Sequence, residues 1–217
     1  TYSLDVLPQE FPCRLTGDFR SPVLDLVNAD GSFGCDLRYQ GYEICDGKYN
    51  LKGLPAVYAA EEEAQTLIIY MKDQVTGLQV ELLYGVLPEY DVITRSAKVI
   101  NTEEDKIRLT KAQAACIDFL HGEFDVISFY GRHAMERNMQ RTSVGHGAFV
   151  IGSRRGTSSH QYNPMMILAE KETTEDAGTC YGMSFVYSGG FKAEVEKDQF
   201  GQTRMQMGLQ EEQFSYP

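Results

Sequence analysis

TLIIYMKDQVTGLQVELLYGV, residues 66–86, determines the fold class of this chain. Two runs rich in leucine, β-branched and aromatic residues, 66–72 and 78–86, flank a short polar segment at 73–77 that ends in glycine. Runs of this length and composition around such a turn predict a β-hairpin. We expect the rest of the chain to pack around antiparallel strands of this kind.

The same pattern continues on both sides of this hairpin. Residues 22–27 and 33–39 flank NADG, and residues 91–100 and 107–120 flank NTEED, which predicts two more hairpins. Further strands are expected at 124–129, 181–187, 191–196 and 202–209. The strongest helical candidate, AQAACIDFL at 112–120, has β-branched and aromatic neighbours, and we interpret it as strand. Many strands with short turns, without a blade-length repeat or a linker, predict one all-β sandwich domain over residues 1–217.

Composition narrows the possible functions. A net charge of −11 argues against a nucleic-acid partner, because phosphates would be repelled. No window approaches eighteen apolar residues, so we expect no transmembrane helix. Five scattered cysteines without a CxxC pair indicate reduced thiols, and with no apparent secretory leader they favour a cytoplasmic protein. The first residue is Thr1 and not Met, so we expect a piece of a longer protein.

A polar segment, SRRGTSSHQYNP at 153–164, contains no aliphatic side chain and is predicted to be a loop. Its guanidinium, imidazole and amide groups come from Arg154, Arg155, His160, Gln161 and Asn163. Such groups pair with carboxylates or with vicinal sugar hydroxyls, although a solvated surface loop has the same composition. Ser158 and Ser159 adjoin His160, but neighbours in sequence seldom form a nucleophile–base pair.

A second charged segment, GRHAMERNMQR at 131–141, surrounds His133 with arginine and glutamate. We interpret it as a surface connection that pairs its own charges, with ligand contact by His133 as the alternative. The other histidines, His121 and His146, lack nearby Cys or His at metal-ligand spacing, so no metal site is expected.

Several motifs in order carry a family resemblance: TGDFRSP (16–22), CDLRY (35–39), LKGLPAVY (51–58), YDVITRSAKVIN (90–101) and YSGGFKAEVEKDQFGQTR (187–204). With the segment 153–164, they resemble the amino-terminal domain of the large bacterial α-galactosidases of glycoside hydrolase family 36. The resemblance implies a large two-sheet antiparallel β-supersandwich of the galactose mutarotase-like type. It also implies a parent enzyme that hydrolyses terminal α-galactosides, such as melibiose and raffinose, with retention.

The resemblance places both catalytic aspartates in a barrel whose KWDMNR-like motif does not occur in this sequence. We therefore assign no catalytic residue and no cofactor to this chain, and we expect it to be inactive alone. His133 falls where the family has the first Trp of a GAWGRERW-like segment, which implies contact with substrate through a smaller ring. Arg154, Arg155, His160 and Asn163 would face the barrel or a partner subunit, since the family often forms homo-oligomers.

Three functions remain open. The first is a non-catalytic α-galactosidase domain that supports the barrel, builds the oligomer and walls part of the substrate pocket. The second is a free-standing carbohydrate-binding module, which requires exposed Tyr or Phe for stacking on sugar rings. The third is a mutarotase-like enzyme, which requires an acid and a base, usually His and Glu, facing one pocket.

Overall fold

The computed structural model describes residues 3–211. Hydrogen bonding groups the strands into three sheets. The five-stranded sheet has the order β1 (Leu24–Val27), β6 (Arg108–Phe119), β13 (Thr203–Leu209), β12 (Phe191–Lys197), β9 (Gly147–Gly152). One four-stranded sheet has the order β11 (Cys180–Ser184), β10 (Tyr162–Glu170), β7 (Phe124–Arg132), β8 (Met135–Ser143). The other has the order β2 (Leu37–Asp46), β3 (Gln65–Asp73), β4 (Gln79–Leu87), β5 (Val92–Ile100).

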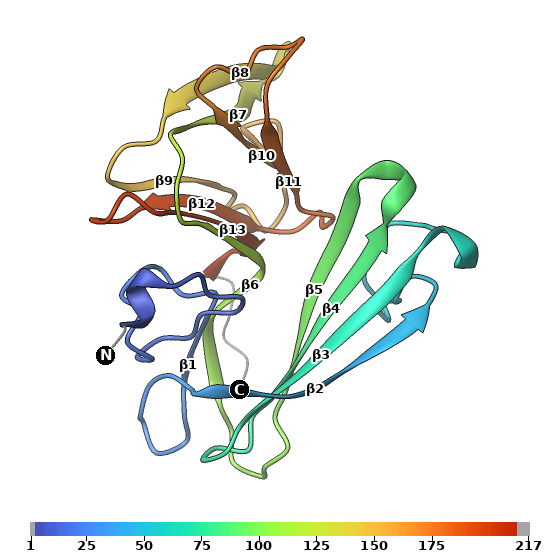
Figure 1. Ribbon diagram of the computed structural model, residues 1–217, viewed down its shortest axis with the longest axis vertical. Coiled ribbons are helices and arrows are strands. Elements are labelled where there is room, and N and C mark those ends of the chain that lie inside the picture. The colour runs from blue at the N-terminus through green and yellow to red at the C-terminus, as the bar shows by residue number, and fades with distance from the viewer. Residues whose placement is uncertain (1–2, 212–217) are drawn as a thin grey trace.

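The predicted all-β antiparallel sandwich is confirmed, since the strands pair antiparallel throughout these sheets. They form three hydrogen-bonded sheets where two large ones were expected. The β11–β10–β7–β8 sheet lies over β9, β12 and β13, and the β2–β5 sheet forms a separate arm beside β6 (Figure 1). Three short 3₁₀ helices complete the described structure: η1 (Leu4–Val6), η2 (Glu61–Glu63) and η3 (Pro88–Tyr90).

The hairpin predicted from residues 66–86 is confirmed as β3 and β4. Its register runs from Gln65 opposite Val86 to Lys72 opposite Gln79. The turn is closed by the Asp73 amide, which donates to the Leu78 carbonyl at 2.8 Å. Gly77 adopts φ 73°, a conformation that favours glycine, so the turn chemistry and the flanking strands agree.

The other two predicted hairpins are wrong, although their turns lie where expected. β1 pairs with β6 and β2 pairs with β3, so only an isolated bridge, Val27 with Phe33, joins the strands around NADG. β5 pairs with β4, whereas β6 pairs with β1 and β13. The turn residues reverse the chain locally, but the two strands that flank each turn belong to different sheets. The assignment of residues 112–120 as strand is confirmed within β6.

The sequence predictions also omit β8, β9 and β10. β8 replaces the connection expected over residues 131–141, and it is an exposed edge strand rich in charged residues. Edge strands commonly carry charges that discourage pairing with other chains, so β8 lacks the apolar alternation of a half-buried strand. β10 begins at Tyr162, so the last three residues of the predicted loop, Asn163 among them, are strand.

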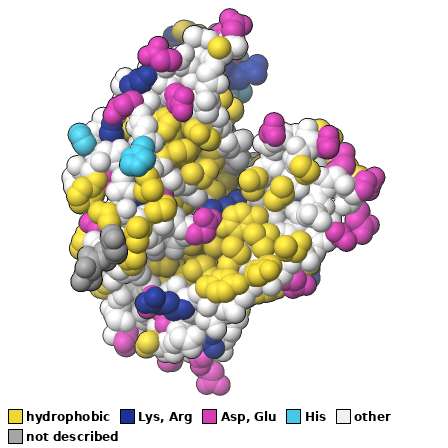
Figure 2. All heavy atoms as spheres, in the orientation of Figure 1, with side chains coloured by type: hydrophobic (Ala, Val, Ile, Leu, Met, Phe, Trp, Pro, Cys, Tyr) yellow, Lys and Arg dark blue, Asp and Glu magenta, His cyan; other side chains and the backbone are white. Residues whose placement is uncertain are grey.

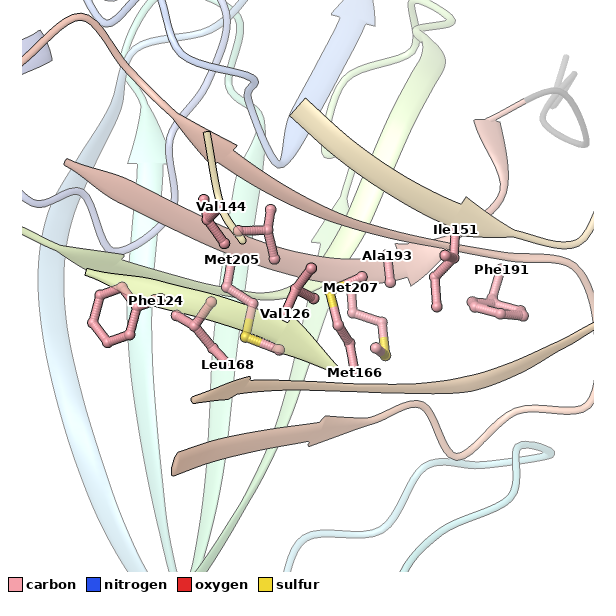
Figure 3. Packing of buried hydrophobic residues seen from close by; sticks show 11 residues of the cluster. Phe124, Val126, Val144, Ile151, Met166, Leu168, Phe191, Ala193, Met205 and Met207 are labelled. Carbon is pink, nitrogen blue, oxygen red and sulfur yellow. The ribbon is translucent and has the colours of Figure 1, made fainter. Parts of the chain in front are cut away.

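Two hydrophobic clusters hold the sheets together. In the first, Phe124, Val126, Met166 and Leu168 face a second layer (Figure 3). That layer comprises Val144, Ile151, Phe191, Ala193, Val195, Met205 and Met207. The second cluster joins the β2–β5 arm to β1 and the amino-terminal segment. It comprises Phe11, Cys13, Val23, Leu24, Leu26, Cys35, Leu78, Val80, Leu82 and Cys116.

Candidate functional site: the arginine-rich end of the β7–β10 sheet

The turn between β7 and β8 places His133 in solvent. Tyr130 lies opposite Asn138 and Arg132 lies opposite Met135, with an irregularity in the register between them. Ala134 takes a positive φ of 61°, and its amide donates to the Glu136 carboxylate at 2.9 Å. The side chains of Arg132 and His133 are exposed at the tip of this hairpin.

Gly131 allows the two strands of this hairpin to approach closely. A Cβ atom at Gly131 would collide with the backbone carbonyl of Met135 and lie 2.8 Å from the Cα atom of Glu136. The tip therefore depends on a glycine immediately before the exposed Arg132 and His133.

The connection between β9 and β10 forms an ordered loop. The Ser153 amide donates to the Phe191 carbonyl at 2.9 Å, and its hydroxyl donates to the Thr157 carbonyl at 2.6 Å. The Ser158 amide donates to the Ser188 carbonyl at 2.8 Å. Because these bonds hold the backbone, the exposed side chains of Arg154 and Arg155 project from a fixed base.

His160 and Asn163, at the far side of this loop, have different surroundings. His160 is exposed, whereas Asn163 lies half-buried in β10. The Asn163 Oδ1 atom is buried and accepts no hydrogen bond from any described residue. The structure therefore separates Asn163 from the three exposed members of the predicted interface group.

The two charged segments meet at one end of the sheet. Tyr162, at the start of β10, pairs with Tyr130 near the end of β7. The Gly131 amide also donates to the Gln161 carbonyl at 3.3 Å. We call this region, residues 130–137 and 154–162, the arginine-rich end. Strand pairing brings His133 to the same end of the sheet as Arg155, which sequence reasoning treated separately.

At this end, the guanidinium groups of Arg132, Arg137 and Arg155 are exposed to solvent. Within residues 3–211, no carboxylate forms an ion pair with Arg132, Arg137 or Arg155. Among the described residues, Arg132 donates to the Met135 sulfur at 3.3 Å. Exposed Tyr130 adds an aromatic side chain beside them. These arginines concentrate positive charge on a chain whose net charge is −11. Guanidinium groups bind carboxylates and hydroxyl oxygens, so this end is suited to such ligands.

The opposite end of the same sheet, which we call the ion-pair end, binds its own charges. Arg141 donates to the Asp125 carboxylate at 2.8 Å and to the Thr173 carbonyl at 2.6 Å. Ser143 donates to Asp125 at 2.9 Å, and Lys171 donates to the same carboxylate. Burial alone would raise the pKa of Asp125, but the bonds from Lys171, Arg141 and Ser143 outweigh it and lower the pKa to about 2.

Sequence reasoning missed a third arginine cluster, which lies in the interior. Arg204 is fully buried and donates to Asp18 at 2.7 Å and to both carboxylate oxygens of Asp118 at 2.7 Å. Arg20 donates to both oxygens of Asp18 at 2.9 Å. Burial alone would raise the pKa of the Asp18 carboxyl group, but the bonds from Arg20 and Arg204 lower it. Asp18 is therefore held in its charged form.

This buried network has a structural and not a catalytic arrangement. Its carboxylates are paired with arginine, and the motif TGDFRSP supplies Asp18 and Arg20 to it. Arg204 is a charged residue within β13, a strand rich in methionine. This pattern is the signal that could have located the network.

Hollows in the surface lie away from the predicted residues. One of about 660 Å³ lies at the outer end of the β2–β5 arm, where Figure 2 shows acidic side chains. It is lined by Asp46, Glu61, Glu62, Glu63, Ala64, Gln65, Val86 and Pro88. Within residues 3–211, no three His, Cys, Asp or Glu side chains are placed to hold a metal ion. No helix in the described part of the chain is long and apolar enough to cross a membrane.

Comparison with known proteins agrees with this fold. A family profile described as "Glycosyl hydrolase family 36 N-terminal domain" matches residues 1–217. The "Bifunctional alpha-galactosidase/sucrose kinase AgaSK" of Mediterraneibacter gnavus is 61% identical over 100% of this chain and 23% of its own length. "Alpha-galactosidase Mel36A" of Lactobacillus acidophilus is 42% identical over 100% of this chain and 30% of its own length.

Solved structures show the same similarity. The galactosidase domain of AgaSK superposes with a TM-score of 0.97 at 61% identity, over 100% of this chain and 30% of that chain. The α-galactosidase AgaA of Geobacillus stearothermophilus, in complex with stachyose, gives a TM-score of 0.95 at 42% identity, over 97% of this chain and 30% of that chain. This chain therefore spans less than a third of the length of these relatives.

Proposed function

The chain belongs to the family of glycosyl hydrolase family 36 N-terminal domains, and we propose that it acts as a single non-catalytic domain, residues 1–217, within a longer α-galactosidase. The parent protein would hydrolyse terminal α-galactosides. AgaA structures in complex with stachyose and with raffinose support this substrate class. The five free cysteines support a cytoplasmic location.

The arginine-rich end is the observation on which the proposed role of this domain rests. Arg132, Arg137 and Arg155 extend from a hydrogen-bonded base and have no carboxylate partner among residues 3–211. Such groups contribute little to the stability of the domain itself, because exposed charges are well solvated. We assign Arg154, Arg155 and His160 to an interface with the catalytic barrel or a partner subunit, with Asn163 beneath them in β10.

The same end supplies the proposed contribution to the substrate pocket. His133 stands at the tip of the β7–β8 hairpin near exposed Tyr130. Imidazole nitrogens donate and accept hydrogen bonds with sugar hydroxyls, and a tyrosine ring stacks on a pyranose face. His133 would then contact substrate only in the assembled enzyme.

Two measurements test this assignment. Raffinose hydrolysis is measured for the whole protein and for the 217-residue chain at equal molar concentration. We expect turnover by the whole protein and none by the chain, since the catalytic aspartates implied by the family lie outside it. Raffinose turnover by the chain alone would contradict the proposal.

The second measurement is a titration of the chain with galactose and raffinose. No saturable binding is expected, because the pocket requires the barrel. Saturable binding would instead favour a free-standing carbohydrate-binding module.

A further inference from the structure

Two cysteines far apart in sequence meet beside strand β1. Cys13 forms a parallel bridge with Leu24, and the Gly34 amide donates to the Leu26 carbonyl at 3.3 Å. Alternate residues of a strand present their backbone groups to the same edge, so residues 13–14 and 34–35 lie along one edge of β1. Since Phe33 bridges Val27 antiparallel, these two segments run in opposite directions.

The contact between the two segments fixes which residues face each other. A Cβ atom at Gly34 would collide with the backbone carbonyl of Arg14, so residues 14 and 34 touch. Residue 14 adjoins Cys13 and residue 34 adjoins Cys35, so this contact brings the two cysteines to the same place beside β1. Both Cys13 and Cys35 are buried in the same hydrophobic cluster, at 4% and 8% exposure.

The environment of Cys13 agrees with this placement. Its sulfur contacts the Phe11 carbonyl at 3.7 Å. Interaction with the Cys35 thiol, followed by burial, raises the pKa of Cys13 far above its usual range. A disulfide requires a Cα separation of about 4.4–6.8 Å, and the contact between residues 14 and 34 brings together the backbone next to both cysteines.

We propose that Cys13 and Cys35 form an oxidisable dithiol that closes to a disulfide bond by exchange with a small-molecule disulfide such as oxidised glutathione. One cysteine thiolate attacks the glutathione disulfide, which forms a mixed disulfide and releases one glutathione thiolate. The second cysteine thiolate attacks the protein sulfur of that mixed disulfide and releases the other glutathione. Two protein thiols lose two protons and two electrons, and one glutathione disulfide is reduced to two glutathione thiols.

Burial makes opening of the amino-terminal segment the step that precedes reaction. The thiolate is the reacting form, and the closed structure disfavours it at Cys13. The disulfide would link this segment covalently to the connection between β1 and β2. The adjoining Asp18 and Arg20 already anchor the segment through the buried network.

To test this, the whole protein is treated with oxidised glutathione at increasing, sub-denaturing concentrations of urea. The remaining thiols are then blocked by alkylation. Cysteine-containing peptides are mapped by mass spectrometry without reduction. We expect a peptide pair joined through Cys13 and Cys35, formed faster as urea rises. Exposed Cys180 should instead carry glutathione at a rate nearly independent of urea. If Cys13 and Cys35 are both recovered alkylated after Cys180 has reacted fully, the proposal is overturned.

Variants separate this pair from other pairings. Cys13→Ser should abolish the cross-link and leave Cys35 with glutathione, and Cys180→Ser should retain the cross-link. Cys116 shares the buried cluster, so a peptide joining Cys13 to Cys116 would also overturn the proposal. The mapping on the unsubstituted protein decides the matter if Cys13→Ser does not fold.

Discussion

The two ends of the β11–β10–β7–β8 sheet both carry arginines, but the two ends differ in whether these arginines are paired with carboxylates. At the ion-pair end, Arg141 is bound by the Asp125 carboxylate and by backbone carbonyls, and Lys171 completes the network. At the arginine-rich end, Arg132 and Arg155 have no carboxylate partner among residues 3–211. One sheet therefore presents a self-contained end and an end that is available to a partner.

This difference separates arginines that stabilise the domain from arginines that we propose contact another part of the assembled enzyme. Arg204 is the extreme of the first kind, since it is fully buried between Asp18 and Asp118. Removing such a group leaves excess negative charge in a buried cluster, whereas removing an exposed arginine leaves no buried group unsatisfied. Stability and activity measurements on single substitutions should tell the two kinds apart.

Arg204→Met should have the largest effect. The substitution keeps an unbranched side chain but leaves Arg20 as the remaining cation beside the two buried carboxylates, Asp18 and Asp118. We expect the free energy of unfolding to fall by about 3–5 kcal/mol, measured by urea denaturation. Arg155→Met is the matched control and should stay within about 0.5 kcal/mol of the unsubstituted protein. Equal losses for the two variants would remove the distinction.

Asp125→Asn should destabilise the ion-pair end by roughly 1–3 kcal/mol at neutral pH, because its bonds to Arg141 and Lys171 lose their charge. Folding lowers the pKa of Asp125 from 3.8 to about 2, so the carboxylate stabilises the native state above pH 3.8. That contribution declines as the pH falls from 3.8 to about 2. Urea denaturation across this range should show the two proteins converging, and a constant difference in unfolding free energy would contradict the assignment.

Arg155→Glu reverses a charge at the arginine-rich end and should act on the assembled enzyme. We expect the activity of the whole protein on raffinose to fall about tenfold, which corresponds to about 1.4 kcal/mol. Arg38→Glu is the matched control, since Arg38 is also an exposed arginine but lies on the β2–β5 arm. If both variants keep full activity, Arg155 has no role at an interface.

His133→Ala should have the smallest effect. Loss of a single neutral hydrogen bond to sugar costs about 0.5–1 kcal/mol, which raises KM for raffinose roughly two- to fivefold. The unfolding free energy should not change, because His133 is exposed at a hairpin tip. An unchanged KM would remove His133 from the substrate pocket.

Much of the fold could be predicted because its strands bury one face. Runs rich in leucine, β-branched and aromatic residues around a turn located β3 and β4, and the flanking residues identified β6 as strand. The partner of each strand was less predictable. β1 and β2 flank a favourable turn sequence, yet β1 pairs with β6 and β2 pairs with β3. β8 could not be located by its pattern, because an exposed edge strand buries neither face.

The candidate site was predictable in composition but not in arrangement. Polar patterning identified His133 and the loop residues Arg154, Arg155 and His160. Only the pairing of Tyr130 with Tyr162 shows that the two segments share one end of a sheet. The buried network around Arg204 joins residues separated by 186 positions in the sequence, a distance that no local pattern reports.

Amide hydrogen exchange of the 217-residue chain and of the whole protein tests the central claim most directly. Slow exchange at β12, in the core, confirms in both samples that the domain is folded. We predict slower exchange in the whole protein at residues 132–137 and 153–161, with no change around Asp125 and Arg141 at the ion-pair end. Equal exchange of the arginine-rich end in the two samples would contradict its assignment as the interface.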